Sequence, residues 1–210
     1  MTAWVVKLGG SLFTSGQLPR WLDVIADAGA GKVVIVPGGG PWADEVRRAQ
    51  MREGFDDRTA HRKALRAMEQ YARVLADMRP NLVPAMSVAA IHDILCSGQI
   101  AVWMPHAMVV AEAAIPENWE VTSDSLAAWL ASRLAASGVL LVKSLQIDGP
   151  QPAIEEMMLR GWVDSAFAKF TSALRAPVLL VGQGDQKAVQ EILRGDASTR
   201  GPTLTRKLSN

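Results

Sequence analysis

The sequence predicts an α/β protein, a three-layer αβα sandwich with a mainly parallel central sheet. Two observations lead to this prediction. Short apolar runs alternate along the chain with longer amphipathic segments, which is the pattern of repeated β-α-β units. The runs are also apolar at nearly every position, as strands must be when helices cover both faces of their sheet. No internal repeat or low-complexity linker interrupts the 210 residues, so we expect a single domain over 1–210.

The predicted strands are short runs rich in Val, Ile and Leu. Five runs fit this description: Trp4–Leu8, Lys32–Val36, Ala101–Met104, Val139–Val142 and Val178–Val181. A weaker sixth candidate is Leu82–Ala85, and the following segment, Ser87–Leu95, is predicted as a helix or a loop.

The amphipathic segments between these runs predict helices. The longest, His61–Met78, repeats apolar residues at three- and four-residue spacing and so has one apolar face. A second helix, Ser123–Ser137, carries three leucines in the same register. The other predicted helices are Leu18–Ala28, Pro41–Glu53, Ser165–Arg175 and Asp185–Leu193.

Charge and cysteine content exclude several classes of protein. The formal net charge is +1 and no basic stripe is visible, so we expect no nucleic-acid partner. No run approaches the roughly 18 uncharged apolar residues of a membrane span, and the first residues do not resemble a signal peptide. The single cysteine, Cys96, cannot form an internal disulfide, and its apolar neighbours predict a buried side chain. We therefore expect a cytoplasmic protein with no membrane partner.

A lysine and two glycines lie at the end of the first predicted strand, in the run Lys7-Leu8-Gly9-Gly10-Ser11. Glycines let backbone amides approach an anion closely, because no Cβ intervenes, and Lys7 places a cation beside them. A tight turn with a solvated lysine would produce the same residues. The run alone therefore leaves a phosphate site and a simple turn open.

A triple glycine, Gly38-Gly39-Gly40, separates the second predicted strand from a predicted helix. Consecutive glycines before free helix N–H groups make an anion cradle, and a simple turn seldom needs three. The spacing from Gly38 to Ala43 also fits the loose dinucleotide fingerprint, but the acidic residue expected about 20 positions later is missing. No G-x-x-x-x-G-K-[ST] run occurs, which excludes a P-loop. We favour a ligand-facing loop.

Two further polar stretches lie at predicted helix starts. Thr122 and Ser123 precede an apolar helix, where either suits the N-cap, and Asp124 follows them. Asp164 can cap the predicted helix at 165, and Lys169 lies inside that helix between two phenylalanines, where snorkelling over apolar surface is the simplest explanation. Taken singly, both stretches are explained by local structure.

Side chains for metal binding or nucleophilic catalysis do not form a recognisable pattern. The three histidines, His61, His92 and His106, are too far apart in sequence for a close metal-ligand spacing, and the chain has no Cys/His cluster. Ser11 has no G-x-S-x-G context. We expect no protein-held metal centre and no serine nucleophile.

In this order, the motifs resemble the amino acid kinase superfamily, whose members share an N-terminal K-x-G-G-S, a G-G-G loop, a mid-chain helix start with an aspartate, a D-G turn and a late lysine. The resemblance covers nearly the whole chain. The corresponding segments here are Lys7–Ser11, Gly38–Gly40, Thr122–Ser125, Ile147–Gly149 and Gly161–Lys169.

The resemblance implies phosphoryl transfer from ATP with Mg²⁺, in a homo-oligomer, to a small molecule. It implies that Lys7 and Lys169 offset charge on the transferred group and that Asp124 orients both lysines. It places the acceptor in a half covering about 1–118 and the nucleotide in a half covering about 119–210. The implied nucleotide-binding residues are Gly9, Gly10, Ser11, Lys143, Ser144, Asp148, Gly149 and Asp164. The implied acceptor-binding residues are Gly38, Gly39, Gly40, Arg47, His61, Thr122 and Ser123.

Within the superfamily, three stretches are most similar to the small kinases of methanofuran biosynthesis: Pro37–Arg47, Ala60-His61 with Ala67–Ala72, and Trp119–Trp129. That resemblance implies a phosphate-monoester acceptor, [5-(aminomethyl)furan-3-yl]methyl phosphate, converted to its diphosphate. The chain departs from many members at Lys143-Ser144, where they carry Thr-Asp or a similar pair, and it is shorter than most.

Other functions stay open at this stage. A carboxylate kinase or an isopentenyl-phosphate-type kinase would use the same machinery with another acceptor pocket. A non-catalytic nucleotide- or oxyanion-binding storage protein of the same fold is the alternative of another class, and a Rossmann oxidoreductase is a third. Lys7, Asp124 and Lys169 favour a kinase, because storage does not need a pair of lysines around a phosphoryl group.

Overall fold

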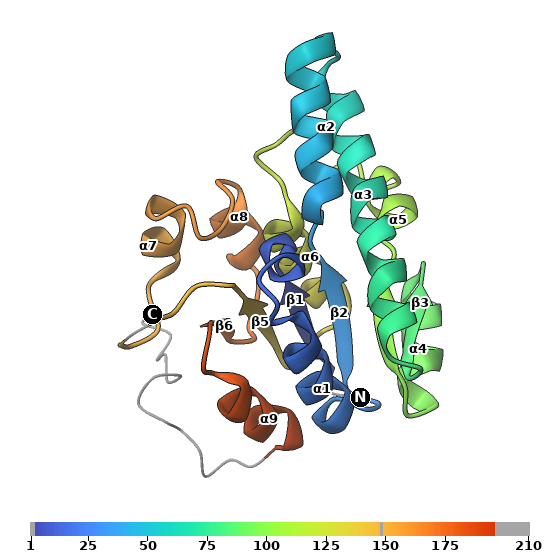
Figure 1. Cartoon of the computed structure of the whole chain (residues 1–210), viewed down its shortest axis with the longest axis vertical. Helices are drawn as coiled ribbons and strands as arrows, with labels where there is room; N and C mark the ends of the chain where they lie inside the picture. The colour runs from blue at the N-terminus through green and yellow to red at the C-terminus, as the bar shows by residue number, and fades with distance from the viewer. Residues whose placement is uncertain (1–2, 148, 196–210) are drawn as a thin grey trace.

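The computed structural model describes residues 3–147 and 149–195, and in them six strands form one parallel sheet (Figure 1). The strand order is β3-β4-β2-β1-β5-β6, and every neighbouring pair is parallel. The strands are β1 (Trp4–Leu8), β2 (Val33–Pro37), β3 (Leu82–Ala85), β4 (Ile100–Trp103), β5 (Gly138–Val142) and β6 (Val178–Val181). The prediction of a parallel α/β sheet is confirmed, and each strand lies within one residue of its predicted bounds.

Helices connect the strands, as the alternating pattern predicts. Their bounds are α1 (Leu18–Ala28), α2 (Gly40–Glu53), α3 (Asp57–Met78), α4 (Val88–Cys96), α5 (His106–Val110), α6 (Ser123–Arg133), α7 (Ile154–Leu159), α8 (Phe167–Thr171) and α9 (Gln186–Arg194), with a short 3₁₀ turn η1 (Gly10–Phe13). The candidate helix after β3 is thus α4.

Two apolar cores lie on the two faces of the sheet, which makes the three layers. Alternate strand residues point to opposite faces, so Val5 belongs to one core and Val6 to the other. The first core packs β-residues against α4, α5, α6, α7 and α8, and the second packs them against α1 and α9. Helix α3 contributes to both, through Leu65 and Tyr71 among others. Both faces of the sheet are therefore covered.

Helices α2 and α3 form an antiparallel pair that extends beyond the ends of the strands (Figure 1). The turn between them is set by two residues: Gly54 takes a left-handed conformation (φ 71°) after α2, and the Asp56 carboxylate caps α3 by accepting from the Thr59 amide at 2.8 Å. This cap starts α3 four residues before the predicted helix. The pair lies at the carboxyl edge of the sheet and lines one side of the space there.

Some predictions differ from the structure. Helices α5 and α7 were not expected, since five or six residues are too few to show a helical period. Helix α8 covers only the middle of the segment predicted as Ser165–Arg175. The Cys96 side chain is exposed, so the expectation that it is buried is wrong: its neighbour Leu95 takes the inward position at the end of α4. None of the helices among the described residues is both long and apolar enough to cross a membrane.

Candidate active site

A cavity of about 620 Å³ opens at the carboxyl edge of the sheet, between the strand ends and the α2–α3 pair. In open parallel sheets this edge is where ligands bind. Lys7 and Asp124 lie in the cavity lining, together with residues of the glycine loops, α2 and α3. The predicted acceptor-binding residues that line it are Gly39, Gly40, Arg47, His61, Thr122 and Ser123.

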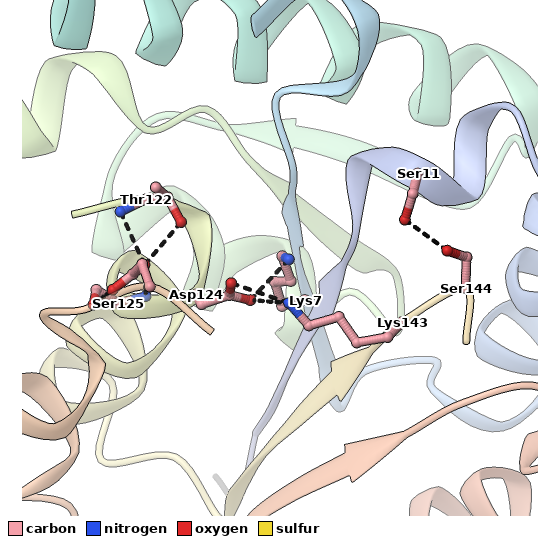
Figure 2. A network of polar contacts seen from close by, with 8 residues as sticks. Lys7, Ser11, Thr122, Asp124, Ser125, Lys143 and Ser144 are labelled. Carbon is pink, nitrogen blue, oxygen red and sulfur yellow. Dashed lines mark hydrogen bonds and ion pairs between the residues drawn. The ribbon is translucent and has the colours of Figure 1, made fainter. Parts of the chain in front are cut away.

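Asp124 lies between two lysine ammonium groups from neighbouring strands (Figure 2). Its Oδ1 is 2.8 Å from Lys7 Nζ and 2.9 Å from Lys143 Nζ, and its Oδ2 is 3.0 Å from Lys143 Nζ. Lys7 is in β1, and Lys143 directly follows β5, which pairs with β1 with Leu8 opposite Val142. Strand pairing therefore brings together two lysines that are far apart in sequence.

These three side chains are nearly removed from solvent. The exposed fractions of the Lys7, Asp124 and Lys143 side chains are 5%, 8% and 13%. Burial by itself would raise the pKa of Asp124, but the two ammonium charges hold it below its ordinary value, so the carboxylate stays ionised. Burial, together with the charge of Lys7, lowers the pKa of Lys143 to about 8 despite its bond to Asp124. The site therefore holds two cations and one anion in a region of low dielectric.

The two glycine loops contact each other backbone to backbone. A Cβ at Gly10 would lie 2.5 Å from the Gly40 amide nitrogen, and a Cβ at Gly38 would lie 2.5 Å from the Gly10 nitrogen. Gly40 has a φ of 56°, which other residues rarely adopt. Because of these contacts the loops lie side by side at the ends of β1 and β2, where their amides can face an anion.

Asp164, in the segment between α7 and α8, caps the start of helix α6. Its carboxylate accepts from the Thr122 amide at 2.9 Å, the Thr122 hydroxyl at 2.8 Å and the Ser125 amide at 3.1 Å, and also from the Ser125 hydroxyl. Thr122 is the N-cap by position, as predicted, but its side chain makes no capping bond; Asp164 supplies it. Burial raises the pKa of Asp164, against the effect of these hydrogen bonds. Asp164 thus fixes the helix that carries Asp124.

The far wall of the cavity is built around Trp119. Its indole N–H donates to Gln50 Oε1 on α2 at 2.6 Å, and the Arg47 guanidinium carbon lies 3.8 Å from the centre of its ring. The stack holds an otherwise exposed arginine against the cavity, since cation–π contacts orient guanidinium groups on tryptophan. Arg48, the next residue, instead pairs with Glu45 at 2.8 Å.

His61, on α3, is 3% exposed and lines the same cavity. Its Nδ1 lies 3.0 Å from the Asn118 carbonyl oxygen, which can only accept, so Nδ1 carries the proton. Burial lowers the pKa of His61, which favours the neutral ring, and Nε2 then bears a lone pair. Nε2 has no hydrogen-bond partner among the described residues. It is suited to accept a hydrogen bond from a ligand rather than to bind a phosphate oxygen.

The remaining residues implied by the resemblance are spread around this centre. The hydroxyls of Ser11 and Ser144 are hydrogen-bonded to each other at 2.8 Å, at the ends of β1 and β5 (Figure 2). Gly9 donates to the Val142 carbonyl at 3.1 Å. Gly149 has a φ of 84°, and Asp148 lies outside the described residues.

Lys169 is not beside Asp124. It is exposed on the five-residue helix α8, with its ammonium 5.9 Å from the centre of the Phe170 ring. The expected pairing of Asp124 with Lys169 is therefore wrong, and the second lysine on Asp124 is Lys143. A sequence signal existed: Lys143 immediately follows one predicted strand, Lys7 lies one residue before the end of another, and adjacent parallel strands end at the same edge.

The sequence comparison agrees with this geometry. The model of the amino acid kinase family matches residues 2–146. The chain belongs to the amino acid kinase family. A [5-(aminomethyl)furan-3-yl]methyl phosphate kinase of Methanocaldococcus jannaschii is 26% identical over 149 residues, which are 69% of this chain and 66% of that protein. The match thus spans slightly less than two thirds of the relative's length. Family membership and a relative that is a kinase support a phosphotransferase.

Solved structures share the fold. A uridylate kinase of Archaeoglobus fulgidus superposes with a TM-score of 0.67 at 17% identity, covering 92% of this chain and 96% of that one. A UMP kinase of Ureaplasma parvum gives 0.64 at 15% identity, covering 92% of both chains. An isopentenyl phosphate kinase gives 0.58 at 15% identity, covering 92% and 96%. The likeness covers both sides of the sheet, so the fold prediction of an amino acid kinase-like sandwich is confirmed.

Proposed function

We propose that this protein transfers the γ-phosphoryl group of ATP to a small phosphate monoester, with [5-(aminomethyl)furan-3-yl]methyl phosphate as the acceptor. The observation that carries this proposal is the buried arrangement of Lys7 and Lys143 around Asp124 at the inner end of a cavity. Phosphoryl transfer depends mainly on positioning and on stabilising negative charge, and two fixed ammonium groups supply that charge stabilisation.

A phosphate acceptor suits this site because its reaction needs no general base. An oxygen of the acceptor phosphate forms a bond to the γ-phosphorus while the bond from that phosphorus to the β,γ-bridging oxygen breaks. ADP leaves with the electron pair, and total charge is unchanged without moving a proton. Asp124, the carboxylate on the two lysines, is held ionised by both of them and is a poor proton acceptor. Its role is to orient the lysines.

The cavity wall offers complementary groups to the rest of such an acceptor. Arg47, held on Trp119, presents a guanidinium that can bind phosphate oxygens. His61 Nε2 is a buried acceptor with no partner among the described residues, and an ammonium such as the aminomethyl group can donate a hydrogen bond to it if the acceptor enters beside this ring. The M. jannaschii relative is a kinase of the aminomethylfuran phosphate, which carries both groups.

The nucleotide phosphates fit between the glycine loops and the ends of β1 and β5. A Cβ at Gly10 or Gly39 would clash with the Gly40 backbone or with Ala43, so only glycine lets the two loops pack this closely, and their backbone amides can face an anion there. The described residues include no group of three or more side chains able to hold a metal ion. Mg²⁺ carried mainly by the phosphates needs no such group, and when bound it neutralises part of their charge.

The decisive experiment measures Mg-ATP-dependent ADP release with a panel of acceptors. The panel contains the aminomethylfuran phosphate, isopentenyl phosphate, UMP, acetylglutamate and aspartate. We expect turnover on the furan phosphate at least a hundred-fold faster than on the other four, measured as kcat/KM. Faster turnover on a carboxylate or on another phosphate keeps the phosphoryl transfer and removes the proposed acceptor.

Binding without turnover would favour the alternative of a different class. A storage protein of this fold would bind ATP or oxyanion clusters and release no ADP with any acceptor. An oxidoreductase would bind NAD and not ATP. Calorimetric titration with ATP and with NAD, on the same preparation, separates an oxidoreductase from the other two, and the ADP-release assay then separates a storage protein from a kinase.

A further inference from the structure

The resemblance to the amino acid kinases implies that Lys143, the cation on the β5 side of the site, binds nucleotide, but it gives Lys143 no part in the transfer of the phosphoryl group. Lys143 Nζ reaches both oxygens of Asp124, at 2.9 and 3.0 Å, and its side chain is 13% exposed, more than that of Lys7. A buried ammonium is costly unless it is paired or serves a ligand, and Asp124 already has Lys7 as a partner. One carboxylate between two ammonium groups leaves a local excess of positive charge.

We propose that Lys143 is a catalytic residue: its ammonium binds the terminal phosphate of ATP and stabilises the phosphoryl group during transfer, in the position that Lys169 does not occupy. This inference rests on the proposed kinase function. The excess positive charge requires an anion, and a terminal phosphate between Lys7 and Lys143 supplies one.

The position of Lys143 in the fold puts it on the nucleotide side. Lys7 and Asp124 line the cavity formed with α2 and α3, whereas Lys143 approaches Asp124 from β5. The segment after Lys143 packs on the loop after β6: the Gln183 amide donates to the Leu145 carbonyl at 2.9 Å, and the Gln183 side chain donates to the Ser144 carbonyl at 2.6 Å. Lys143 is thus at the junction between the acceptor cavity and the β5–β6 loops.

A pH dependence follows from the surroundings of Lys143. The charged groups facing it are Asp124 on α6 and Lys7 on β1. Burial lowers the pKa of Lys143 to about 8 in the free protein, so the charged form is present below that pH and is lost above it. We expect kcat/KM for ATP, which reports the free enzyme, to fall as pH rises through about 8.

The test compares four variants: Lys143→Gln, Lys143→Arg, Lys169→Gln and Lys63→Gln. Lys63 is exposed on α3 and lies over the Phe55 ring, outside the cavity, so its variant is the inert control. We expect Lys143→Gln to lower kcat by about 10²–10³-fold, the usual loss for one donor to developing charge, while thermal unfolding shows a folded protein. Lys143→Arg keeps the charge at all accessible pH values and should lose the fall above pH 8.

A binding measurement makes the inference independent of turnover. Titration calorimetry should show that Lys143→Gln weakens ATP at least tenfold and ADP much less, because only ATP carries the terminal phosphate. If wild type binds ATP but turns over no acceptor, the proposed function fails, and this ATP-to-ADP comparison still tests Lys143. Near-wild-type kcat and ATP affinity in Lys143→Gln overturn the inference, and so does a large loss in Lys169→Gln with none in Lys143→Gln.

Discussion

The two sides of the site are built in different ways. On the side formed by β1, β2, α2 and α3, the segments are close in sequence, and short motifs fix the geometry: two glycine loops in contact and a capped helix pair. On the side formed by β5 and the segments after it, the contacts join segments distant in sequence, such as Asp164 with Thr122 and Gln183 with Ser144. Sequence motifs therefore predict the contacts on the β1–α3 side well, whereas the contacts on the β5 side are seen only in the folded structure.

Asp124 belongs to both sides, so its replacement should have the largest effect. Asp124→Asn removes the carboxylate between two buried lysines, and breaking a buried ion pair in this way typically costs about 3–5 kcal/mol. We expect a loss of that size in the free energy of urea unfolding and a fall in kcat of at least a hundred-fold. The matched control, Asp23→Asn, breaks only the surface pair with Arg79 and should change stability by less than about 1 kcal/mol. Equal effects in the two variants would show that the ion pairs of Asp124 contribute no more to stability than the surface pair of Asp23.

Gly10→Ala tests the backbone contact between the two glycine loops. Its Cβ would lie 2.5 Å from the Gly40 nitrogen, where neither backbone can give way easily. We expect destabilisation of about 2–3 kcal/mol, as for overpacked sites, and weaker ATP binding. Gly54→Ala is the control: it meets no atom within 4 Å and carries only the cost of its left-handed conformation, about 1 kcal/mol. Chemical denaturation of both variants decides between a steric and a purely conformational role.

Arg47→Gln tests whether the guanidinium stacked on Trp119 binds the acceptor. If Arg47 binds the acceptor phosphate, its loss should raise KM for the acceptor about tenfold with little change in kcat, the signature of lost ground-state binding. Arg48→Gln removes the same charge one residue away, from a side chain that pairs with Glu45 at the surface. Steady-state kinetics should leave the KM of that control unchanged. A similar rise in both would mean a general electrostatic effect.

Ser125→Ala probes the cap of helix α6 and should have a smaller effect on stability than Asp124→Asn or Gly10→Ala. The Ser125 hydroxyl is fully buried and donates to Asp164, so its loss removes one bond to a capping carboxylate. We expect about 1–2 kcal/mol of destabilisation in thermal or urea unfolding. Ser132→Ala, on an exposed position of the same helix, should be within about 0.5 kcal/mol of wild type. No loss in Ser125→Ala would mean that the Thr122 contacts suffice to cap α6.

The fold is largely predictable because buried strands have a simple sequence pattern. Each strand is a run of Val, Ile and Leu, and these runs were found within one residue of their bounds. The helices α5 and α7 were missed, since five or six residues show no period and both depend on tertiary packing.

For the site, the sequence predicts well which residues of a single motif take part, and poorly which residues from separate segments contact each other. Lys7 and Asp124 were both selected, and they are in contact. Lys143 was selected for nucleotide binding, yet its contact with Asp124 was assigned to Lys169, because the motif order says nothing about which lysine reaches the carboxylate through space. The cap by Asp164 was missed for the same reason: its bond to Thr122 joins two separate segments.

The central place of β1 in the sheet has a consequence for biosynthesis. Of the strands in the described residues, β1 is synthesised before the others, yet one of its two neighbours, β5, is made more than a hundred residues later, so Trp4 has no Gly138 to pair with until then. Until then Lys7 has neither Asp124 nor Lys143 beside it, and its charge stays in water. Long-range parallel pairing of this kind forms slowly, so the apolar β1 lacks one of its two neighbours until the β5 segment has been made.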